Sequence, residues 1–125
     1  MFQCLFFVYV PPDIQAVRSL RLHPFVFPER PVVGTQVSVT CTTVEAVQNV
    51  NFRWFKNGRP LTGTERDTRV RLRTFPDVST LVIGPIKEDD SGNYTCTGTA
   101  GLKSDSYTQT LRVLGEFRPP LRMTS

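Results

Sequence analysis

The chain has 125 residues, a net charge of +4 and a hydrophobic fraction of 39%, which fits one globular domain and excludes a large multidomain enzyme. This composition is too apolar for a disordered chain and too polar for a membrane bundle. The basic excess, 15 Lys and Arg against 11 Asp and Glu, is too mild to indicate nucleic-acid binding. The cysteine count of three is odd, so an oxidising compartment would leave one thiol unpaired.

The N-terminal flank carries a concentrated apolar run, residues 2–10, which stops at Pro11-Pro12. The run is far shorter than the ~20 residues that span a bilayer. Two interpretations of residues 1–20 remain open: a secretory signal peptide, or the last strand of a preceding domain followed by a stiff Pro-Pro linker. Both place residues 1–20, with Cys4, outside the main domain.

The middle of the chain alternates apolar and polar residues with period two, in short runs separated by turn residues, as half-buried strands do. Turns are expected at Asn57-Gly58-Arg59-Pro60, at Pro76-Asp77 and over 88–92. No amphipathic helix of useful length is present. The pattern predicts an antiparallel sandwich or barrel, with strands at 37–41, 51–56, around 70–72, 80–83, 93–97 and 107–114 and room for one more short strand between 54 and 81.

Three residues at inward-facing strand positions follow the order Cys, Trp, Cys: Cys41, Trp54 and Cys96. The second cysteine closes an Asp-x-Gly-x-Tyr-x-Cys signature that begins at Asp90. With this combination the chain resembles an immunoglobulin domain. The resemblance implies an all-β, immunoglobulin-like antiparallel β-sandwich with Greek-key connections. It covers residues 21–115 and leaves 116–125, which contain a second Pro-Pro, as a C-terminal linker or tail.

The resemblance also implies roles for the core residues. Cys41 and Cys96 would form one inter-sheet disulfide, and Trp54 would pack its flat ring against it. Closing a loop of this length stabilises a fold by about 4 kcal/mol on the chain-entropy model. Leu81 and Ile83 are expected in the same core.

The residues before Cys96 have expected roles of their own. Tyr94 is placed for a tyrosine corner, in which its hydroxyl returns to the backbone a few residues upstream. Asp90 would accept hydrogen bonds or an ion pair, with Arg69 or Arg71 as the candidate partner, and Gly92 would tolerate the tight backbone before the strand.

The short connection between Trp54 and Leu81 is similar to the intermediate set (I-set) of immunoglobulin domains in adhesion molecules. The opening stretch, Pro24-Phe25-Val26-Phe27-Pro28, looks closest to arthropod Down-syndrome-cell-adhesion-molecule-like and hemicentin-like proteins. Such proteins carry many of these domains in tandem.

Catalysis has little support in the sequence. His23 is the only histidine and lies before a proline at the edge of the domain, where a surface role is expected. The run Glu88-Asp89-Asp90 is explained by a turn and by the structural role of Asp90. There is no Cys/His cluster for zinc and no glycine-rich phosphate loop. We therefore expect no enzyme activity, catalytic residue, metal, cofactor or small-molecule substrate.

Arginines are concentrated between residues 66 and 73, at Arg66, Arg69, Arg71 and Arg73. The last three alternate, so one strand face would present them about 7 Å apart. Such a row suits the sulfates or carboxylates of an anionic glycan, which Arg binds in a bidentate fork. The competing interpretation, which we favour from sequence, is a solvated face balanced by nearby acidic residues.

Asn93-Tyr94-Thr95 is an acceptor sequence for N-glycosylation at Asn93. The same tripeptide is also ordinary strand sequence beside a tyrosine corner, and we favour that second interpretation.

The function implied by the resemblance is extracellular protein–protein recognition on a secreted or cell-surface protein, in cell adhesion or innate recognition. The partner would be a second copy or another cell-surface protein, bound through a sheet face or near the edge at Pro24 to Val33. The alternative is a structural spacer module of a matrix or muscle array. Free thiols at Cys41 and Cys96 would favour the muscle alternative, because disulfides do not persist in reducing cytosol.

Overall fold

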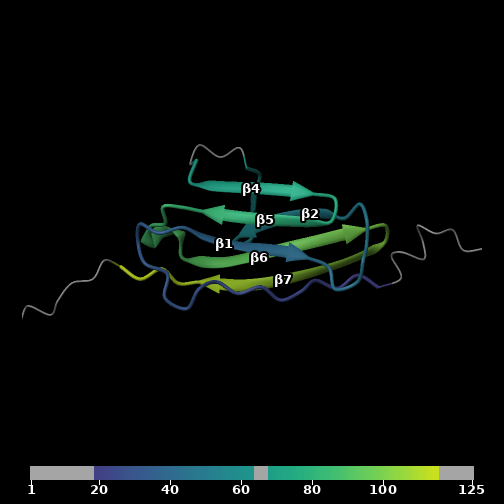
Figure 1. The fold of residues 1–125 in the computed structure, drawn as a ribbon, viewed down its shortest axis with the longest axis horizontal. Coiled ribbons are helices and arrows are strands. Elements are labelled where there is room, and N and C mark those ends of the chain that lie inside the picture. The colour runs from purple at the N-terminus through teal and green to yellow at the C-terminus, as the bar shows by residue number, and fades with distance from the viewer. Residues whose placement is uncertain (1–18, 64–67, 116–125) are drawn as a thin grey trace, which may run out of the picture.

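The computed structural model describes residues 19–63 and 68–115, drawn in colour in Figure 1. Two antiparallel sheets pack face to face, one with strand order β1-β5-β4 and the other with order β3-β2-β6-β7. Strands distant in sequence, such as β1 and β5 or β2 and β6, are neighbours because the chain crosses repeatedly between the sheets. The predicted all-β antiparallel sandwich is confirmed. The predicted flanks are residues 1–20 and 116–125. Residues 1–18, with Cys4, and residues 116–125 lie outside the described residues, whereas Leu20 is buried in the core of the domain.

The three-stranded sheet contains β1 (Val37–Thr42), β4 (Val70–Phe75) and β5 (Val78–Ile83). β1 and β5 alternate buried and outward positions with period two, because successive side chains in a strand point to opposite faces. The inward positions of β1 and β5 are fully buried, whereas β4 is an edge strand and half-buried at best.

The four-stranded sheet contains β2 (Asn51–Lys56), β3 (Arg59–Leu61), β6 (Gly92–Ala100) and β7 (Lys103–Leu111). β6 and β7 pair over their full lengths, from Gly92↔Leu111 to Ala100↔Lys103. The sequence placed these two strands at 93–97 and 107–114. Their facing ends were missed because the residues there are mostly hydroxylic or charged and show no apolar alternation.

The β2–β3 hairpin is tighter than expected. Asn57 and Gly58 alone form the turn, with φ of 50° and 84°, as a two-residue type I′ loop requires. Arg59 and Pro60 therefore already belong to β3, where Pro60 pairs with Phe55. Proline is tolerated there because β3 is an edge strand. The expected acidic turn is the short 3₁₀ helix η2 (Glu88–Asp90).

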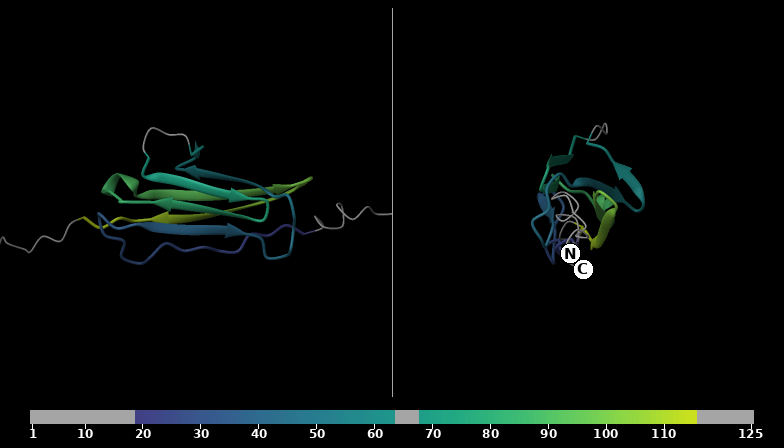
Figure 2. Two further views of the ribbon diagram at one scale, coloured as in Figure 1. Left: turned by 45° about the horizontal axis from the view of Figure 1, so that its top comes forward. Right: turned by 90° about the vertical axis from the view of Figure 1, so that its right-hand side faces the viewer.

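The core lies between the sheets and is completed by the segment that precedes β1. Phe25 from this segment packs its ring 5.5 Å from that of Trp54 and 5.1 Å from that of Tyr107, and Phe27 lies 5.5 Å from Tyr94. Two isolated bridges pair the segment with residues just beyond the strands, Leu22↔Thr43 after β1 and Val32↔Leu114 after β7. Figure 2 shows it, in purple, along the side of the sandwich where β1 and β7 lie. The stretch from Pro24 to Val33 therefore contributes core residues as well as an exposed edge.

Candidate interaction surfaces

The centre of the molecule is a disulfide between β1 and β6. Cys41 and Cys96 are joined at 2.06 Å, which confirms the predicted inter-sheet bond. Trp54 is buried beside it, and its indole N–H donates to the Ser79 hydroxyl at 2.8 Å. Ser79 was not predicted as a core residue, although its position two residues before Leu81 places both on the same, inward face of the strand. Leu81 and Ile83 are both fully buried.

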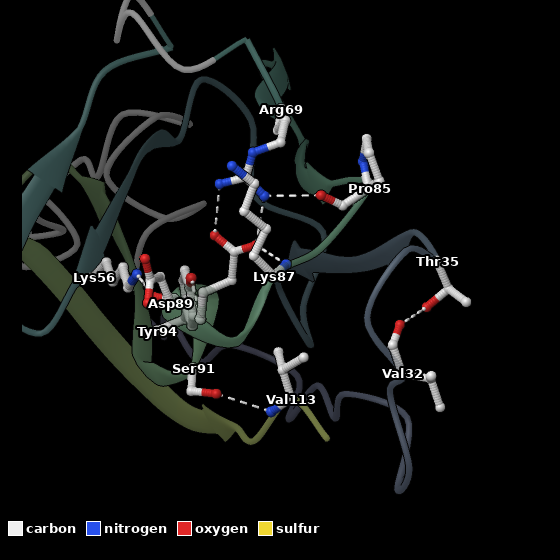
Figure 3. Close-up of polar contacts among 11 residues, drawn as sticks. Val32, Thr35, Lys56, Arg69, Pro85, Lys87, Asp89, Ser91, Tyr94 and Val113 are labelled. Atoms are coloured by element: carbon white, nitrogen blue, oxygen red, sulfur yellow. Dashed lines mark hydrogen bonds and ion pairs between the residues drawn. The ribbon is translucent and has the colours of Figure 1, made fainter. Parts of the chain in front are cut away.

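A second cluster lies at the end of the sandwich around η2 (Figure 3). The Tyr94 hydroxyl donates to the backbone oxygen of Asp90 at 2.6 Å, and burial raises the pKa of Tyr94 above its ordinary value. The Asp90 carboxylate accepts from Arg69 at 2.6 and 3.2 Å and from the backbone N–H of Lys87 at 2.7 Å. These contacts join Arg69, the residue before β4, to η2 and join η2 to β6.

Arg69 is the arginine that pairs with Asp90, and Arg71 instead donates to the Gln36 side chain at 3.0 Å. Gly92 lies beside this cluster, where an added Cβ would be 3.0 Å from the Asn57 side chain. Its φ of 157° is one that other residues rarely adopt, so glycine suits this position, and a larger residue would also displace the Asn57 side chain.

The predicted row of arginines is shorter than expected. Arg69 directs its guanidinium to Asp90 and to the Pro85 carbonyl, and its side chain is only 17% exposed. It does not stand in an outward row, because the fold uses its charge to compensate a buried carboxylate. Arg66 lies outside the described residues. Arg71 and Arg73 remain as exposed members of β4.

The outer face of the three-stranded sheet surrounds these two arginines. Cross-strand pairing places Arg71 beside Val82, which in turn pairs with Ser38 of β1, and places Arg73 beside Thr80. The outward residues of the three strands include no carboxylate. They are Ser38, Thr40, Thr42, Arg71, Arg73, Phe75, Val78, Thr80 and Val82.

The outer face of the four-stranded sheet, called here the binding face, has a different character. Hydroxyl side chains pair across β6 and β7, Thr95 with Thr108 at 2.7 Å and Thr97 with Ser106 at 2.8 Å. This hydroxyl-rich face was not predicted, although Thr and Ser recur at every second residue in both strands. Its outward residues are Asn51, Arg53, Phe55, Pro60, Asn93, Thr95, Thr97, Thr99, Ser104, Ser106, Thr108 and Thr110.

Asn93, the predicted glycosylation acceptor, is exposed near one end of the binding face. Its side-chain oxygen accepts from the Thr110 hydroxyl at 2.6 Å. Its backbone N–H donates to the Asn57 side chain at 2.9 Å. The amide nitrogen that would carry a glycan belongs to a side chain at the protein surface.

Within the part of the chain that the structure describes, no group of three or more His, Cys, Asp or Glu side chains lies together as metal ligands would. His23 is exposed, as expected, and its backbone N–H donates to Thr42. Within the same residues, no helix has the length and hydropathy to cross a membrane.

The chain is similar to segments of several cell-surface proteins. It is 44% identical over 73 residues to MAM domain-containing glycosylphosphatidylinositol anchor protein 2 of Homo sapiens, covering 54% of this chain and 7% of that protein. It is 25% identical over 105 residues to the membrane-bound isoform of pro-neuregulin-1 of Mus musculus, covering 84% of this chain and 15% of that protein. It is 32% identical over 73 residues to neural cell adhesion molecule 1 of Bos taurus, covering 58% of this chain and 8% of that protein. The chain thus spans only a small part of the length of these relatives.

Solved structures share the fold. The Ig7 domain of Dscam1, isoform 5, superposes with a TM-score of 0.69 at 23% identity, covering 76% of this chain and 96% of that domain. The M4 domain of titin superposes with a TM-score of 0.62 at 22% identity, covering 76% of this chain and 95% of that domain.

A family model described as an immunoglobulin domain matches residues 25–99, which contain both half-cystines, Trp54 and the complete Asp90 to Cys96 signature. The match, the sandwich and the inter-sheet disulfide agree with the relatives, whose names describe anchored, membrane-bound or adhesion proteins. The chain belongs to the immunoglobulin domain family.

Proposed function

We propose that this domain is a non-enzymatic, extracellular recognition module that binds a protein partner through the binding face of its four-stranded sheet. The partner is a second copy of the chain or another cell-surface protein. The resemblance to adhesion-type relatives supports recognition in general, and the chemistry of the two sheet faces supports the choice of surface.

The disulfide supports the extracellular assignment. Bonds such as Cys41–Cys96 form and persist in oxidising compartments, whereas cytosolic proteins keep their thiols reduced. A muscle spacer would work in the reducing cytosol, so the bond disfavours that alternative. The likeness to titin extends to the fold alone.

The observation that carries the proposal is the composition of the binding face. Its outward residues include no Asp, Glu or Lys, the charged types that are depleted from protein interfaces. Arg53 and Phe55 stand near its middle on β2, next to Thr97 and Thr95 of β6. Arginine and aromatic residues are enriched at protein interfaces, and arginine is a frequent energetic hot spot.

The binding face is also ordered before any partner arrives. The Thr95–Thr108 and Thr97–Ser106 pairs fix hydroxyl groups between two strands that are paired along their full length. Short side chains held this way lose little rotamer entropy on binding, whereas each long flexible side chain loses about 0.5–1.5 kcal/mol. A rigid, hydroxyl-rich patch of this kind, with Arg53 as its charged residue, suits a protein surface.

A glycan introduced on each sheet face tests the proposal. Ser106→Asn creates the acceptor Asn-Tyr-Thr with Thr108 in the middle of the binding face. Ser38→Asn creates Asn-Val-Thr with Thr40 on the opposite sheet and is the matched control. Mass spectrometry measures the occupancy of each site.

The assay uses beads coated with the full chain, scored for self-aggregation and for capture by intact cells. We expect the Ser106→Asn glycan to abolish whichever binding the unmodified chain shows, and the Ser38→Asn glycan to leave it in place. Loss with the control glycan alone, or retention with both, would overturn the assignment of the face. Arg53→Ala should weaken the same binding without changing thermal stability.

A further inference from the structure

We propose that the outer face of the three-stranded sheet holds a second site, for a linear sulfated glycan that lies along β4. Arg71 and Arg73 bind its anionic groups, and Phe75 supports a sugar ring. These three residues are called here the β4 row. The site uses the sheet opposite the binding face, so it stands independently of the proposed function.

The β4 row is straight because its members alternate along one strand. Arg71, Arg73 and Phe75 are each two residues apart and point outward, while Leu72 between them packs against the core. Two residues of strand span about 7 Å, so the row extends over about 13 Å. An extended ligand can contact all three side chains at once.

The row has donors already positioned for anionic groups. Arg71 donates to the Gln36 side chain at 3.0 Å, which orients its guanidinium and leaves other N–H groups available. Arg73 is exposed and pairs across the sheet with Thr80, whose hydroxyl lies 3.2 Å from that of Thr40. A planar guanidinium binds a sulfate or carboxylate in a bidentate fork, and the hydroxyls add weaker donors beside it.

The charge around the row favours an anionic ligand. The outward residues of β1, β4 and β5 include no Asp or Glu. Asp77 lies beyond Phe75 in the β4–β5 turn, at the end of the row away from Arg71, and Asp90 is already paired with Arg69. Among the residues that the structure describes, Arg71 and Arg73 therefore have no carboxylate neighbour on the outer face of their own sheet.

The apolar end of the row favours a glycan over an acidic peptide. Phe75 is 58% exposed and pairs with Val78, which forms an apolar patch with it. The face of an aromatic ring carries negative charge density, which attracts the polarised C–H bonds of a sugar ring. An acidic peptide would need only the two arginines.

The experiment measures the binding of the full chain to heparin, used as the sulfated glycan probe, by elution from immobilised heparin in rising NaCl and by titration with a heparin oligosaccharide. The test variant is Arg71→Ser/Arg73→Ser. The control variant is Arg59→Ser/Arg112→Ser, which removes the same charge from exposed positions outside both the β4 row and the binding face. Circular dichroism melts check that both variants remain folded.

We expect the test variant to bind the oligosaccharide about tenfold more weakly or worse, the loss expected for about 1.4 kcal/mol of charge-assisted hydrogen bonding. The control variant should change less than threefold. Equal losses in the two variants would mean attraction by net charge alone and would overturn the site.

Phe75→Ala and a competitor separate the ligand classes. We expect Phe75→Ala to weaken heparin binding and to leave the weaker binding of poly-glutamate unchanged. Poly-glutamate competing as well as heparin at equal charge, with no effect of Phe75→Ala, would identify an acidic peptide site and overturn the glycan assignment.

Discussion

The ion pair between Arg69 and Asp90 allows a quantitative test of how this fold is held together. Asp90→Ala removes a carboxylate that is 5% exposed and accepts two hydrogen bonds from Arg69 and one from the Lys87 backbone. The backbone oxygen that receives the Tyr94 hydroxyl remains. The variant therefore tests the carboxylate separately from the tyrosine corner.

The expected loss of stability follows from the groups that Asp90→Ala leaves without a partner. Breaking a fully buried ion pair by removing one partner costs about 3–5 kcal/mol. Arg69 is 17% exposed, so water compensates part of its charge and about 2 kcal/mol is expected from this term. The unpaired Lys87 N–H adds about 1 kcal/mol. The total, about 3 kcal/mol, corresponds to a fall in Tm of about 12–24 °C for a domain of this size.

Urea denaturation of the variants in a double-mutant cycle measures the coupling free energy between Arg69 and Asp90. Asp90→Ala should lose about 3 kcal/mol and Arg69→Ala about 2 kcal/mol, with the double variant no worse than Asp90→Ala alone, because the two residues act on one interaction. Asp89→Ala, an exposed neighbour in η2, is the control and should change stability by less than about 0.5 kcal/mol. A cost below about 1 kcal/mol for Asp90→Ala, or strictly additive single variants, would refute the reasoning.

Three further predictions concern the core. Tyr94→Phe removes the hydrogen bond from a buried hydroxyl and should cost about 1–2 kcal/mol in urea denaturation. Because burial raises the pKa of Tyr94, its neutral form stabilises the fold fully below the unfolded value of about 10, and this contribution is lost as the pH rises above that value. Between pH 9 and 11 the Tm should fall more steeply for the unaltered chain than for Tyr94→Phe. Equal slopes of Tm against pH in the two proteins would contradict this. Ser79→Ala leaves the indole N–H of Trp54 unpaired and should cost about 1–3 kcal/mol, against less than about 0.5 kcal/mol for the outward control Thr80→Ala. A Ser79→Ala variant as stable as the control would show that this hydrogen bond contributes nothing. Cys41→Ala/Cys96→Ala should lose about 4 kcal/mol from the loop closed by the disulfide, and a loss below about 1 kcal/mol would contradict the chain-entropy account.

Much of the fold could be predicted from sequence because its strongest signals are local. Val37, Val39 and Cys41 alternate with hydroxyl residues, and such a pattern can bury only one face of a strand. The β7 strand was placed less well. Asp105 is a polar residue on its inward side, and its carboxylate accepts a hydrogen bond from the backbone N–H of Leu22, which is distant in sequence.

The candidate sites were harder to predict because they depend on which partner the charged end of each long side chain contacts. The alternation of Arg69, Arg71 and Arg73 is correct as a backbone pattern, yet Arg69 turns to Asp90 at the sandwich end. No local signal could choose between Arg69 and Arg71 as the partner of Asp90. The choice depends on the position of η2 relative to β4.

The sequence by itself determined the fold class, the strands with apolar alternation and the cysteines that join the sheets, because period-two patterning and a cysteine–tryptophan–cysteine order are properties of the chain. Only the tertiary structure decided which charged groups are paired inside the fold and which are exposed on its surface. Pairing β4 with β5 and β6 with β7 separates a hydroxyl-rich face, on which Arg53 lies, from one that carries Arg71 and Arg73. The physical reason is that a charge is compensated by its neighbours in space, and those neighbours come from strands far apart in the sequence.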